Sequence, residues 1–389
     1  MTKHMQIHPQ SVAARPPLLI RRVDAIPVAL PLKKPMKMAG VTIATADNVL
    51  VRIEADGGQG TQGVVVGWGE AASAPTMTGD IQGSLVAAIR HLAPLLIGTD
   101  AWSGAALMRK LAAALYGNTG AHSAIELALL DLAGRAADLP AINLIGGALR
   151  GAVAPMWLLG NATPAEDAAE ARAKLAEGFR FFKVKVGVKS VEGDIASTLA
   201  VRNALGFEVP ICADANCGFA PADARRYLDG TRDARLLFLE QPLGSHDIKG
   251  LAALARVSAV PLGADEGIHS LDDVAAHADA GAGGVSLKLI KLGGLSAAIE
   301  AARLAARLGL SINVAAKIAE SSIGSAAAIN LACAVPSVDW GVSLTHFYLA
   351  QDIVKAPPRI ADGLVALPPA PGLGVEVDED AVAEFSVRA

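Results

Sequence analysis

Aromatic residues, cysteines and long apolar runs are all scarce in this chain. Only 4% of the 389 residues are Phe, Trp or Tyr although 52% are hydrophobic, so the core must consist mainly of Ala, Leu, Val and Ile. The three cysteines, Cys212, Cys217 and Cys333, form no CxxC pair, which makes a reducing cytoplasm the expected location. No apolar run reaches the roughly 18 residues that a membrane span requires, so we expect no membrane association.

Excess positive charge is also missing. The net charge is -4 and no long basic run occurs, which argues against nucleic acid as a partner. Residues 1–17 have no apolar centre of the kind found in a secretory signal, and they are expected to form a disordered lead-in. The length exceeds that of one ordinary domain, so we expect two structural units.

The first unit is predicted to be an α+β domain spanning residues 18–148. Apolar runs between residues 18 and 72 favour antiparallel strands, with the lysine-rich residues 33–40 as a connecting loop. From residue 80 to about 138 the apolar period becomes helical, most clearly between residues 122 and 139. We expect this α+β domain to cap the second unit.

The second unit, residues 149–357, alternates short apolar strands with Ala-rich helices. The expected strands lie at 153–159, 180–186, 209–214, 236–240, 260–264, 283–288, 310–314 and 338–342. This alternation predicts an α/β fold, a TIM-like (β/α)7β barrel with an α+β N-terminal capping domain. The Pro- and Gly-rich residues 358–389 are expected to pack back on the capping domain.

Two lysines alternate with apolar residues between Arg180 and Gly187. Residues two apart on a strand share a face, so Lys183 and Lys185 should point to one side, away from Phe182 and Val184. If the apolar side packs under helices, both lysines face the barrel interior and require an anionic partner. The alternative is an edge strand with a solvated lysine face.

Three carboxylates end three successive expected strands. They are Asp214, Glu240 and Asp265, separated by about one βα unit each. Equivalent strand ends meet at one mouth of a barrel, where three anions would repel one another. A hard divalent cation relieves that repulsion, so we predict a Mg²⁺ site, with Mn²⁺ as an alternative. Each acid taken singly could instead cap a helix or a turn.

Further ionisable residues are expected at the same mouth. Lys288 ends the sixth strand and would face Lys183 and Lys185 across the metal, as in a bilateral acid/base arrangement. Lys317 and Glu320 follow the seventh strand. Lys317 could equally be a solvated loop residue, and Glu320 could cap the next helix.

These motifs together resemble the muconate lactonizing enzyme subgroup of the enolase superfamily. The matching segments are Lys183-x-Lys185, Asp214-Ala-Asn216, Glu240-Gln-Pro242, Ala264-Asp-Glu266, Lys288 followed by Gly293-Gly294, and Glu320-Ser-Ser-Ile-Gly324, with Gly67-Trp-Gly-Glu70 and Gly372-Leu-Gly374 outside the barrel. The resemblance implies Mg²⁺ on Asp214, Glu240 and Asp265, and acid/base lysines at Lys185 and Lys288. It implies that Lys183 is an electrostatic neighbour of the substrate, that Glu320 is catalytic, that Asn216 and Glu266 support the site, and that the protein is a homo-oligomer.

The reaction implied by the resemblance is isomerisation of a small-molecule carboxylate. An amine removes a proton α to the carboxylate, and Mg²⁺ stabilises the resulting enediolate. Lys317 at the mouth, with Lys37 and its neighbours Lys33 and Lys34 in the expected loop, favours a second carboxylate on the substrate. The leading prediction is therefore a muconate cycloisomerase-like enzyme.

Other substrates and chemistries remain open. A racemase, epimerase or dehydratase could act on a small amino acid such as a proline derivative, whose ammonium Glu320 or Asp339 would hold. Dipeptides are disfavoured, because the Asp-x-Asp pair of the family's dipeptide epimerases is missing near the eighth strand. A Schiff-base aldolase would also use a barrel lysine.

Overall fold

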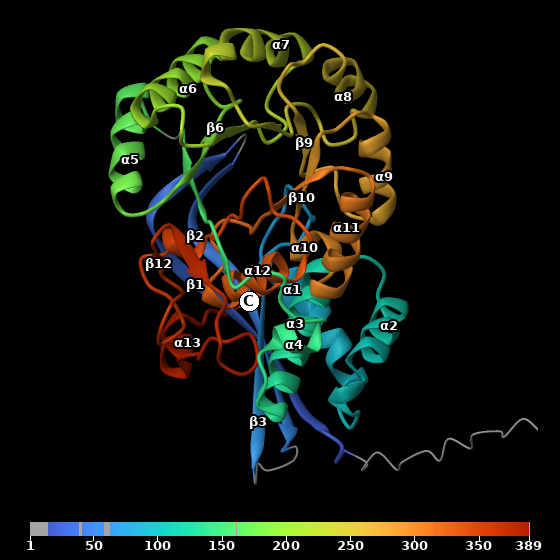
Figure 1. The fold of residues 1–389 in the computed structure, drawn as a ribbon. Coiled ribbons are helices and arrows are strands. Elements are labelled where there is room, and N and C mark those ends of the chain that lie inside the picture. Colours follow the sequence, from blue (N-terminus) through green and yellow to red (C-terminus); the bar gives the residue numbers. More distant parts are fainter. Residues whose placement is uncertain (1–14, 39–40, 58–62, 161, 389) are drawn as a thin grey trace, which may run out of the picture.

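The structure is a computed structural model that describes residues 15–38, 41–57, 63–160 and 162–388, and for residues 37, 38 and 41 it describes the backbone alone. A capping domain, coloured blue to green in Figure 1, lies against a barrel whose helices form an outer arc. Within the described residues, no helix is long and apolar enough to cross a membrane.

The capping domain consists of an antiparallel sheet covered by helices. The strands β1 (Ile20–Met38), β2 (Val41–Asp56) and β3 (Val64–Ala72) pair in that order, and the helices are α1 (Gln82–Leu92), α2 (Gly104–Ala114), α3 (Thr119–Ala137) and α4 (Ala141–Leu144). Helix α3 lies so close to β3 that a side chain at Gly67 or Gly69 would collide with a carbonyl oxygen of α3. The two glycines of the Gly67–Glu70 motif therefore allow the helix to pack directly on the sheet.

The prediction of a loop at residues 33–40 is wrong for residues 33–38. Strand β1 continues to Met38, with a register irregularity between Pro31 and Met36, because β2 pairs again with residues 36–38 beyond the irregularity. The hairpin of β1 and β2 reaches the barrel, where Lys34 pairs with Glu170 of α5 at 2.7 Å. Residues 39 and 40 lie outside the described residues.

The barrel sheet contains seven parallel strands in sequence order. They are β5 (Met156–Leu159), β6 (Phe181–Lys185), β7 (Ile211–Asp214), β8 (Leu239–Glu240), β9 (Leu262–Ala264), β10 (Gly284–Leu287) and β11 (Ser311–Val314). The prediction of an eighth strand at 338–342 is wrong in extent, since Val342 alone forms parallel bridges, to Pro155 and Val314. Asp339 accepts hydrogen bonds from Ser311 and Ser337, and these side-chain contacts hold the preceding segment in a turn.

Helices on the outer face separate the barrel strands. They are α5 (Pro164–Ala176), α6 (Val191–Leu205), α7 (Pro221–Gly230), α8 (Ile248–Ala255), α9 (Leu271–Asp279), α10 (Leu289–Leu292), α11 (Leu295–Arg307) and α12 (Ser322–Ala334). An apolar layer of Met156, Phe181, Cys212, Phe238 and Trp340 fills the barrel near the strand beginnings. The rings of Phe238 and Trp340 stack at 4.0 Å. The charged side chains of the barrel interior therefore lie at the opposite mouth, at the strand ends.

Both ends of the described part of the chain contact the capping domain. In the C-terminal segment, β12 (Ile360–Ala361) and β13 (Leu364–Ala366) join β4 (Ala152–Val153), while Ser386, beyond α13 (Glu379–Phe385), bridges Val28 of β1. At the other end, Arg15 stacks on Trp102 and the Pro16 carbonyl accepts a hydrogen bond from its indole. The expected disordered lead-in therefore does not include residues 15–17, and residues 1–14 lie outside the described residues.

Candidate active site

The lysine-bearing strand β6 lies inside the barrel sheet, between β5 and β7. Lys183 and Lys185 are 3% and 6% exposed and face the interior, whereas Phe182 and Val184 belong to the apolar core under the helices. The alternation read from the sequence is confirmed, and the alternative of a solvated edge strand is wrong. Burial at this depth requires an anionic partner for each ammonium group.

Each predicted carboxylate has a lysine as its partner. Asp214 and Glu240 are directly opposite each other in the β7–β8 register. Lys185 Nζ lies 2.6 Å from Asp214 Oδ2, and Lys183 forms an ion pair with Glu240. Asp265, which follows β9, pairs with Lys288, which follows β10. The structure therefore brings together the residues that the sequence places at the ends of strands β6 to β10.

These ion pairs determine the charge states of the acids. Burial alone would raise the pKa of Asp214, but Lys185 and Lys183 outweigh it and lower that pKa to about 2. Burial, with Asp214 alongside, raises the pKa of Glu240 to about 7. The pKa of Asp265 lies well below its usual range, because the nearby lysines overcome the effect of burial.

Lys291 is a site residue to which the sequence analysis assigned no role. It is fully buried, and its ammonium lies 2.7 Å from Asp265 Oδ1, with the Asp265 carbonyl as a further acceptor. The sequence shows Lys291 three residues after Lys288. It does not show that the side chain points back towards β9, because the short helix α10 causes that turn. Asp265 therefore pairs with two buried lysines, Lys288 and Lys291.

Replacing Asp265 with asparagine is expected to destabilise the fold more than Asp214→Asn. The first change leaves Lys291 buried without a carboxylate, which costs about 3–5 kcal/mol for a broken buried pair. After Asp214→Asn, Lys185 keeps its 2.8 Å contact with Asn216 Oδ1, so the loss should be smaller. Urea unfolding of both variants measures the difference, and equal midpoints would contradict the expectation.

Asn216 and Glu266 form a polar chain behind Lys185. The Asn216 amide accepts from Lys185 and donates to Glu266 Oε1 at 2.9 Å, while its own backbone N–H is held by Asp214 at 3.0 Å. Asn216 has a φ of 41°, a left-handed conformation that asparagine tolerates better than most residues. This contact orients the ammonium of Lys185.

The loop after β11 carries Lys317 and Glu320, both of which are buried. Lys317 Nζ donates to the Ile318 carbonyl at 2.8 Å, and the Lys317 backbone N–H donates to Glu320 Oε1 at 2.9 Å. Burial, with the charge of Lys288 in addition, lowers the pKa of Lys317 to about 8. Burial, reinforced by Glu70, raises the pKa of Glu320 to about 8. The alternative of a solvated Lys317 is therefore wrong.

A small, partly open cavity of about 30 Å³ lies at the barrel mouth. Its lining residues are Met77, Leu158, Lys183, Lys185, Asp214, Asn216, Asp265, Lys288, Ala315, Ala316, Lys317, Ile318, Ser343 and Thr345. In the described structure Glu320 stands behind this wall, next to Thr345, whose hydroxyl accepts from the Glu320 backbone N–H. A second hollow of about 300 Å³, formed by β2 and residues 73–76, shares Lys317 and Ile318 with the cavity.

Several residues predicted for the substrate site lie elsewhere. Asp339 accepts hydrogen bonds from Ser311 and Ile312, the first residues of β11. It therefore lies at the end of the barrel opposite the mouth, and its assignment as an ammonium partner is wrong. Lys33 and Lys34 bind the Phe347 carbonyl and Glu170 and do not line the cavity. The side chain of Lys37 lies outside the described residues.

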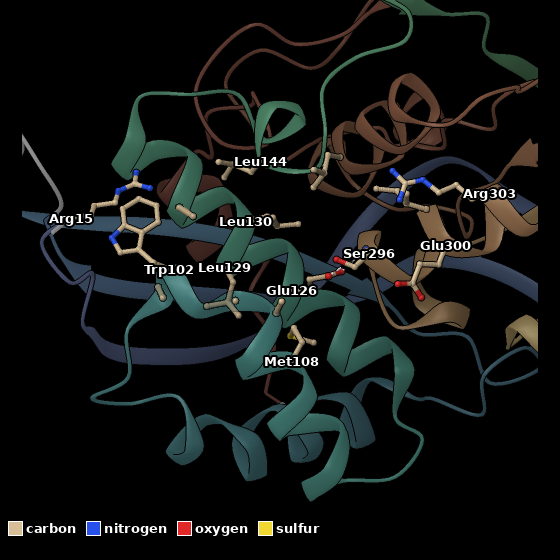
Figure 2. Close-up of a pocket in the computed structure, with 16 residues that line it drawn as sticks. Arg15, Trp102, Met108, Glu126, Leu129, Leu130, Leu144, Ser296, Glu300 and Arg303 are labelled. Carbon is tan, nitrogen blue, oxygen red and sulfur yellow. Dashed lines mark hydrogen bonds between the residues drawn. The ribbon is translucent and has the colours of Figure 1, made fainter. Parts of the chain in front are cut away.

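A larger hollow of about 440 Å³ opens between α11 and the capping-domain helices (Figure 2). Its walls are largely apolar, and Glu126 of α3 lies in its centre against Ser296 of α11. Glu126 accepts from the first backbone N–H groups of α11 and so acts as a cap supplied by another helix. The converging lysines and carboxylates, rather than volume, identify the candidate active site.

Comparisons with known proteins agree with this geometry. Residues 166–381 match the model of the enolase C-terminal domain-like family, and residues 20–146 match that of the mandelate racemase/muconate lactonizing enzyme N-terminal domain. The chain belongs to the enolase superfamily, in its mandelate racemase/muconate lactonizing enzyme family. Both units of the fold are thereby accounted for.

Similar members of this superfamily cover almost the whole chain. Muconate cycloisomerase 1 of Pseudomonas putida is 32% identical over 95% of this chain and 99% of its own length. L-Ala-D/L-Glu epimerase of Bacillus subtilis is 31% identical over 92% and 96%. Muconate lactonizing enzyme of Pseudomonas fluorescens, solved with muconolactone, superposes with a TM-score of 0.90 at 32% identity, covering 95% of this chain and 100% of that one.

The donor set suits a hard divalent cation. Asp214, Glu240 and Asp265 offer carboxylate oxygens alone, the ligands that Mg²⁺ prefers. Across the described residues, no group of three acids, histidines or cysteines is drawn into a ready ligating arrangement, since ammonium groups neutralise the acids instead. A cation would take over that neutralisation if Lys185 and Lys288 moved back from Asp214 and Asp265.

Proposed function

We propose that this protein is a cycloisomerase of a small dicarboxylate of the muconate type. The relatives described above are a cycloisomerase, an epimerase and a lactonizing enzyme, and the chain is an isomerase of the enolase superfamily. The choice of substrate rests on one observation, the position of Lys317.

Lys317 is the lysine lining the cavity that forms no ion pair within the described residues. Lys183, Lys185 and Lys288 all pair with acids, but no carboxylate lies within salt-bridge distance of Lys317 among the described residues. A buried ammonium held by a single carbonyl oxygen is costly without a bound anion. A substrate with a second carboxylate, placed at the wall between the cavity and the 300 Å³ hollow, would supply it.

The residues take the following roles in this proposal. Asp214, Glu240 and Asp265 would hold Mg²⁺, or Mn²⁺, which supplies positive charge to the substrate's carboxylate oxygens. Lys183 adds positive charge near the metal-binding carboxylates and forms an ion pair with Glu240. Asn216, supported by Glu266, orients Lys185.

Proton transfer falls to Lys185 and Lys288, which come from β6 and from the end of β10 and so approach the cavity from different sides. In cycloisomerisation, an oxygen of one carboxylate adds to the carbon β to the other. The double-bond electrons move to the α carbon and its carboxylate as an enediolate, and a lysine ammonium donates a proton to the α carbon. The other lysine stabilises the developing negative charge.

A racemase, epimerase or dehydratase of a small amino acid is the second candidate, favoured by the match to the epimerase and by lysines on two sides of the cavity. It lacks a clear ammonium partner, because Asp339 is remote and Glu320, with its pKa raised to about 8, is largely protonated at neutral pH. A Schiff-base aldolase needs a neutral amine, whereas paired acids hold the pKa of Lys183 and Lys288 above the ordinary value despite burial.

The decisive experiment is a proton-exchange screen in D₂O with Mg²⁺, followed by NMR. The panel contains muconate, its lactone, other dicarboxylates and proline derivatives. Conversion of muconate to lactone with one deuterium at the α carbon would support the proposal. Exchange confined to amino acids would replace it with the second candidate.

Lys317→Met is expected to raise KM for a dicarboxylate by about ten- to a hundredfold, because a charged contact of roughly 1.5–3 kcal/mol is lost. Its effect on kcat should be smaller, since Lys317 contacts the end of the substrate that does not react. Lys34→Met is the matched control, as Lys34 pairs with Glu170 outside the cavity. Equal KM values for the two variants would remove Lys317 from substrate binding.

The homo-oligomeric state and the cytoplasmic location stay predictions of the sequence. Cys212, Cys217 and Cys333 are all free in the described structure.

A further inference from the structure

Glu70 joins the capping domain to the loop that carries the substrate-facing lysine. It lies near the end of β3, is 2% exposed, and accepts hydrogen bonds from Ser321 N at 2.9 Å, Ser321 Oγ at 2.6 Å and Gly324 N at 2.8 Å. Asn48 of β2 donates a fourth hydrogen bond at 2.6 Å. These contacts place the carboxylate at the N-terminus of α12, where the helix dipole also favours an anion.

The same helix terminus faces Glu320. A Cβ atom built on Gly324 would lie 2.8 Å from Glu320 Oε2 and 3.1 Å from Glu70 Oε2, so the two carboxyl groups flank one glycine. Among the described residues, no lysine or arginine forms an ion pair with either acid. Two acids this close and this deeply buried do not both ionise near neutral pH.

The hydrogen bonds decide which acid keeps its proton. Burial raises the pKa of both, but Glu70 receives four donors that favour its charged form, whereas the Glu320 carboxyl receives the backbone N–H of Lys317. The negative charge therefore resides on Glu70 and the proton on Glu320. This distribution leaves the adjacent Lys317 ammonium without an ion-pair partner among the described residues, and Asp47 of β2 is the remaining acid that raises its pKa.

We propose that Glu70 is a positioning residue for substrate charge recognition: as an anion at the N-terminus of α12 it keeps Glu320 uncharged, so that Lys317 faces the cavity as a cation that Glu320 does not neutralise. The consequence for the substrate rests on the proposed function, because a second carboxylate is what Lys317 would bind. The protonation of Glu320 does not rest on it. The capping domain would thus set the charge of a barrel loop.

The charged groups around Glu320 give the sign of the effect. Glu70 of β3 raises its pKa, while Lys317 of the same loop and Lys288 after β10 lower it. Asp352, which binds Ser322, faces Glu70 from the far side and raises the pKa of Glu70. Removing the charge of Glu70 should therefore lower the pKa of Glu320, by about one unit for a close like charge. Glu320 would then ionise near neutral pH and offset the charge of Lys317.

The chain contains a matched control for this change. Glu126 is also a buried glutamate of the capping domain that accepts from the N-terminus of a barrel helix, α11, as Figure 2 shows for its contact with Ser296. No neighbouring charge contributes to the raised pKa of Glu126, which burial dominates. Glu126→Gln should therefore weaken domain packing as Glu70→Gln does, without any effect on Glu320.

The first measurement needs no substrate. The carboxyl carbon of Glu320 is followed by NMR through a pH titration of glutamate-labelled protein and is assigned with Glu320→Gln. We expect the midpoint near pH 8 to fall by about one unit in Glu70→Gln, and to stay in place in Glu70→Asp, which keeps the charge, and in Glu126→Gln. An unchanged midpoint in Glu70→Gln, or an equal fall in Glu126→Gln, overturns the proposal.

The second measurement uses the dicarboxylate that the exchange screen identifies. In Glu70→Gln we expect KM to rise about tenfold at neutral pH, with a smaller change in kcat, and to begin its alkaline rise at lower pH than in the wild type. The effect should vanish in a Glu320→Gln background, where there is no charge to release. A KM rise that persists there overturns the role in charge recognition. Failure of every dicarboxylate in the screen would refute the proposed function and leave the NMR result to decide the proton on Glu320.

Discussion

Lys185→Ala and Lys288→Ala are expected to lower the rate of proton transfer at the substrate's α carbon by about 10²- to 10⁴-fold, the usual contribution of a positioned acid or base. Both lysines line the cavity; Lys185 belongs to β6, and Lys288 directly follows β10, three strands further along the sheet. Each lysine therefore has access to one face of the enediolate. Deuterium incorporation from D₂O, followed by NMR, measures the loss directly.

The relative size of the two losses distinguishes the candidate reactions. A cycloisomerase transfers a proton to only one face of the enediolate, so proton transfer should fall far more in one variant than in the other. A racemase works both faces, so each variant should lose α-proton exchange of one enantiomer and keep that of the other. Lys189→Ala is the control, because Lys189 lies outside the cavity and binds the Ala162 carbonyl and Ser197. Wild-type exchange in both lysine variants would show that neither is the base.

Removal of divalent metal is expected to abolish activity, by at least about 10³-fold, because the enediolate then forms without its main electrostatic stabilisation. Added Mg²⁺ should restore the activity. Asp214→Asn and Glu240→Gln should reproduce the loss and should also weaken Mg²⁺ binding measured by calorimetry. The two carboxylates face each other in the β7–β8 register, so each variant removes one adjacent oxygen donor.

The Mg²⁺-binding measurement shows whether these carboxylates bind a metal ion or act only in proton transfer. After Asp214→Asn, Lys185 keeps its contact with Asn216 Oδ1, and after Glu240→Gln, Lys183 keeps Asp214 at 4.0 Å, so both variants should remain folded and their Mg²⁺ affinity can be measured. Glu126→Gln should bind Mg²⁺ as the wild type does, since Glu126 lies against α11 and not at the barrel mouth. Full activity in excess EDTA, or unchanged Mg²⁺ binding in both carboxylate variants, would refute the metal-dependent mechanism.

Local periodicity was sufficient to predict which side chains of β6 face the barrel interior. A strand alternates its side chains, so the order Phe182, Lys183, Val184, Lys185 already predicts two buried lysines once helices cover the apolar side. Regular βα spacing was likewise sufficient to place Asp214, Glu240 and Asp265 at one mouth, because equivalent strand ends converge in a closed parallel sheet. These features depend on geometry that repeats along the chain.

Pairing between distant segments was not predictable in this way. Residues 33–38 have the lysines typical of a loop, but β1 continues through them because β2 pairs with residues 36–38. Lysine is usually a surface residue, but the short helix α10 turns Lys291 towards Asp265. Asp339 was a candidate ammonium partner in the region of the expected eighth strand, 338–342, whereas its contacts with Ser311 and Ser337 place it at the end of the barrel opposite the mouth.

The sequence by itself determined the barrel, the capping domain and the set of acids and lysines at one mouth, because short-range periods and evenly spaced strand ends specify them. The tertiary structure alone decided which ammonium neutralises which carboxylate, and it placed Glu70 beside Glu320 across 250 residues of chain. Ion pairs and proton positions depend on distances between segments far apart in the chain, and such distances exist only after the capping domain has docked on the barrel.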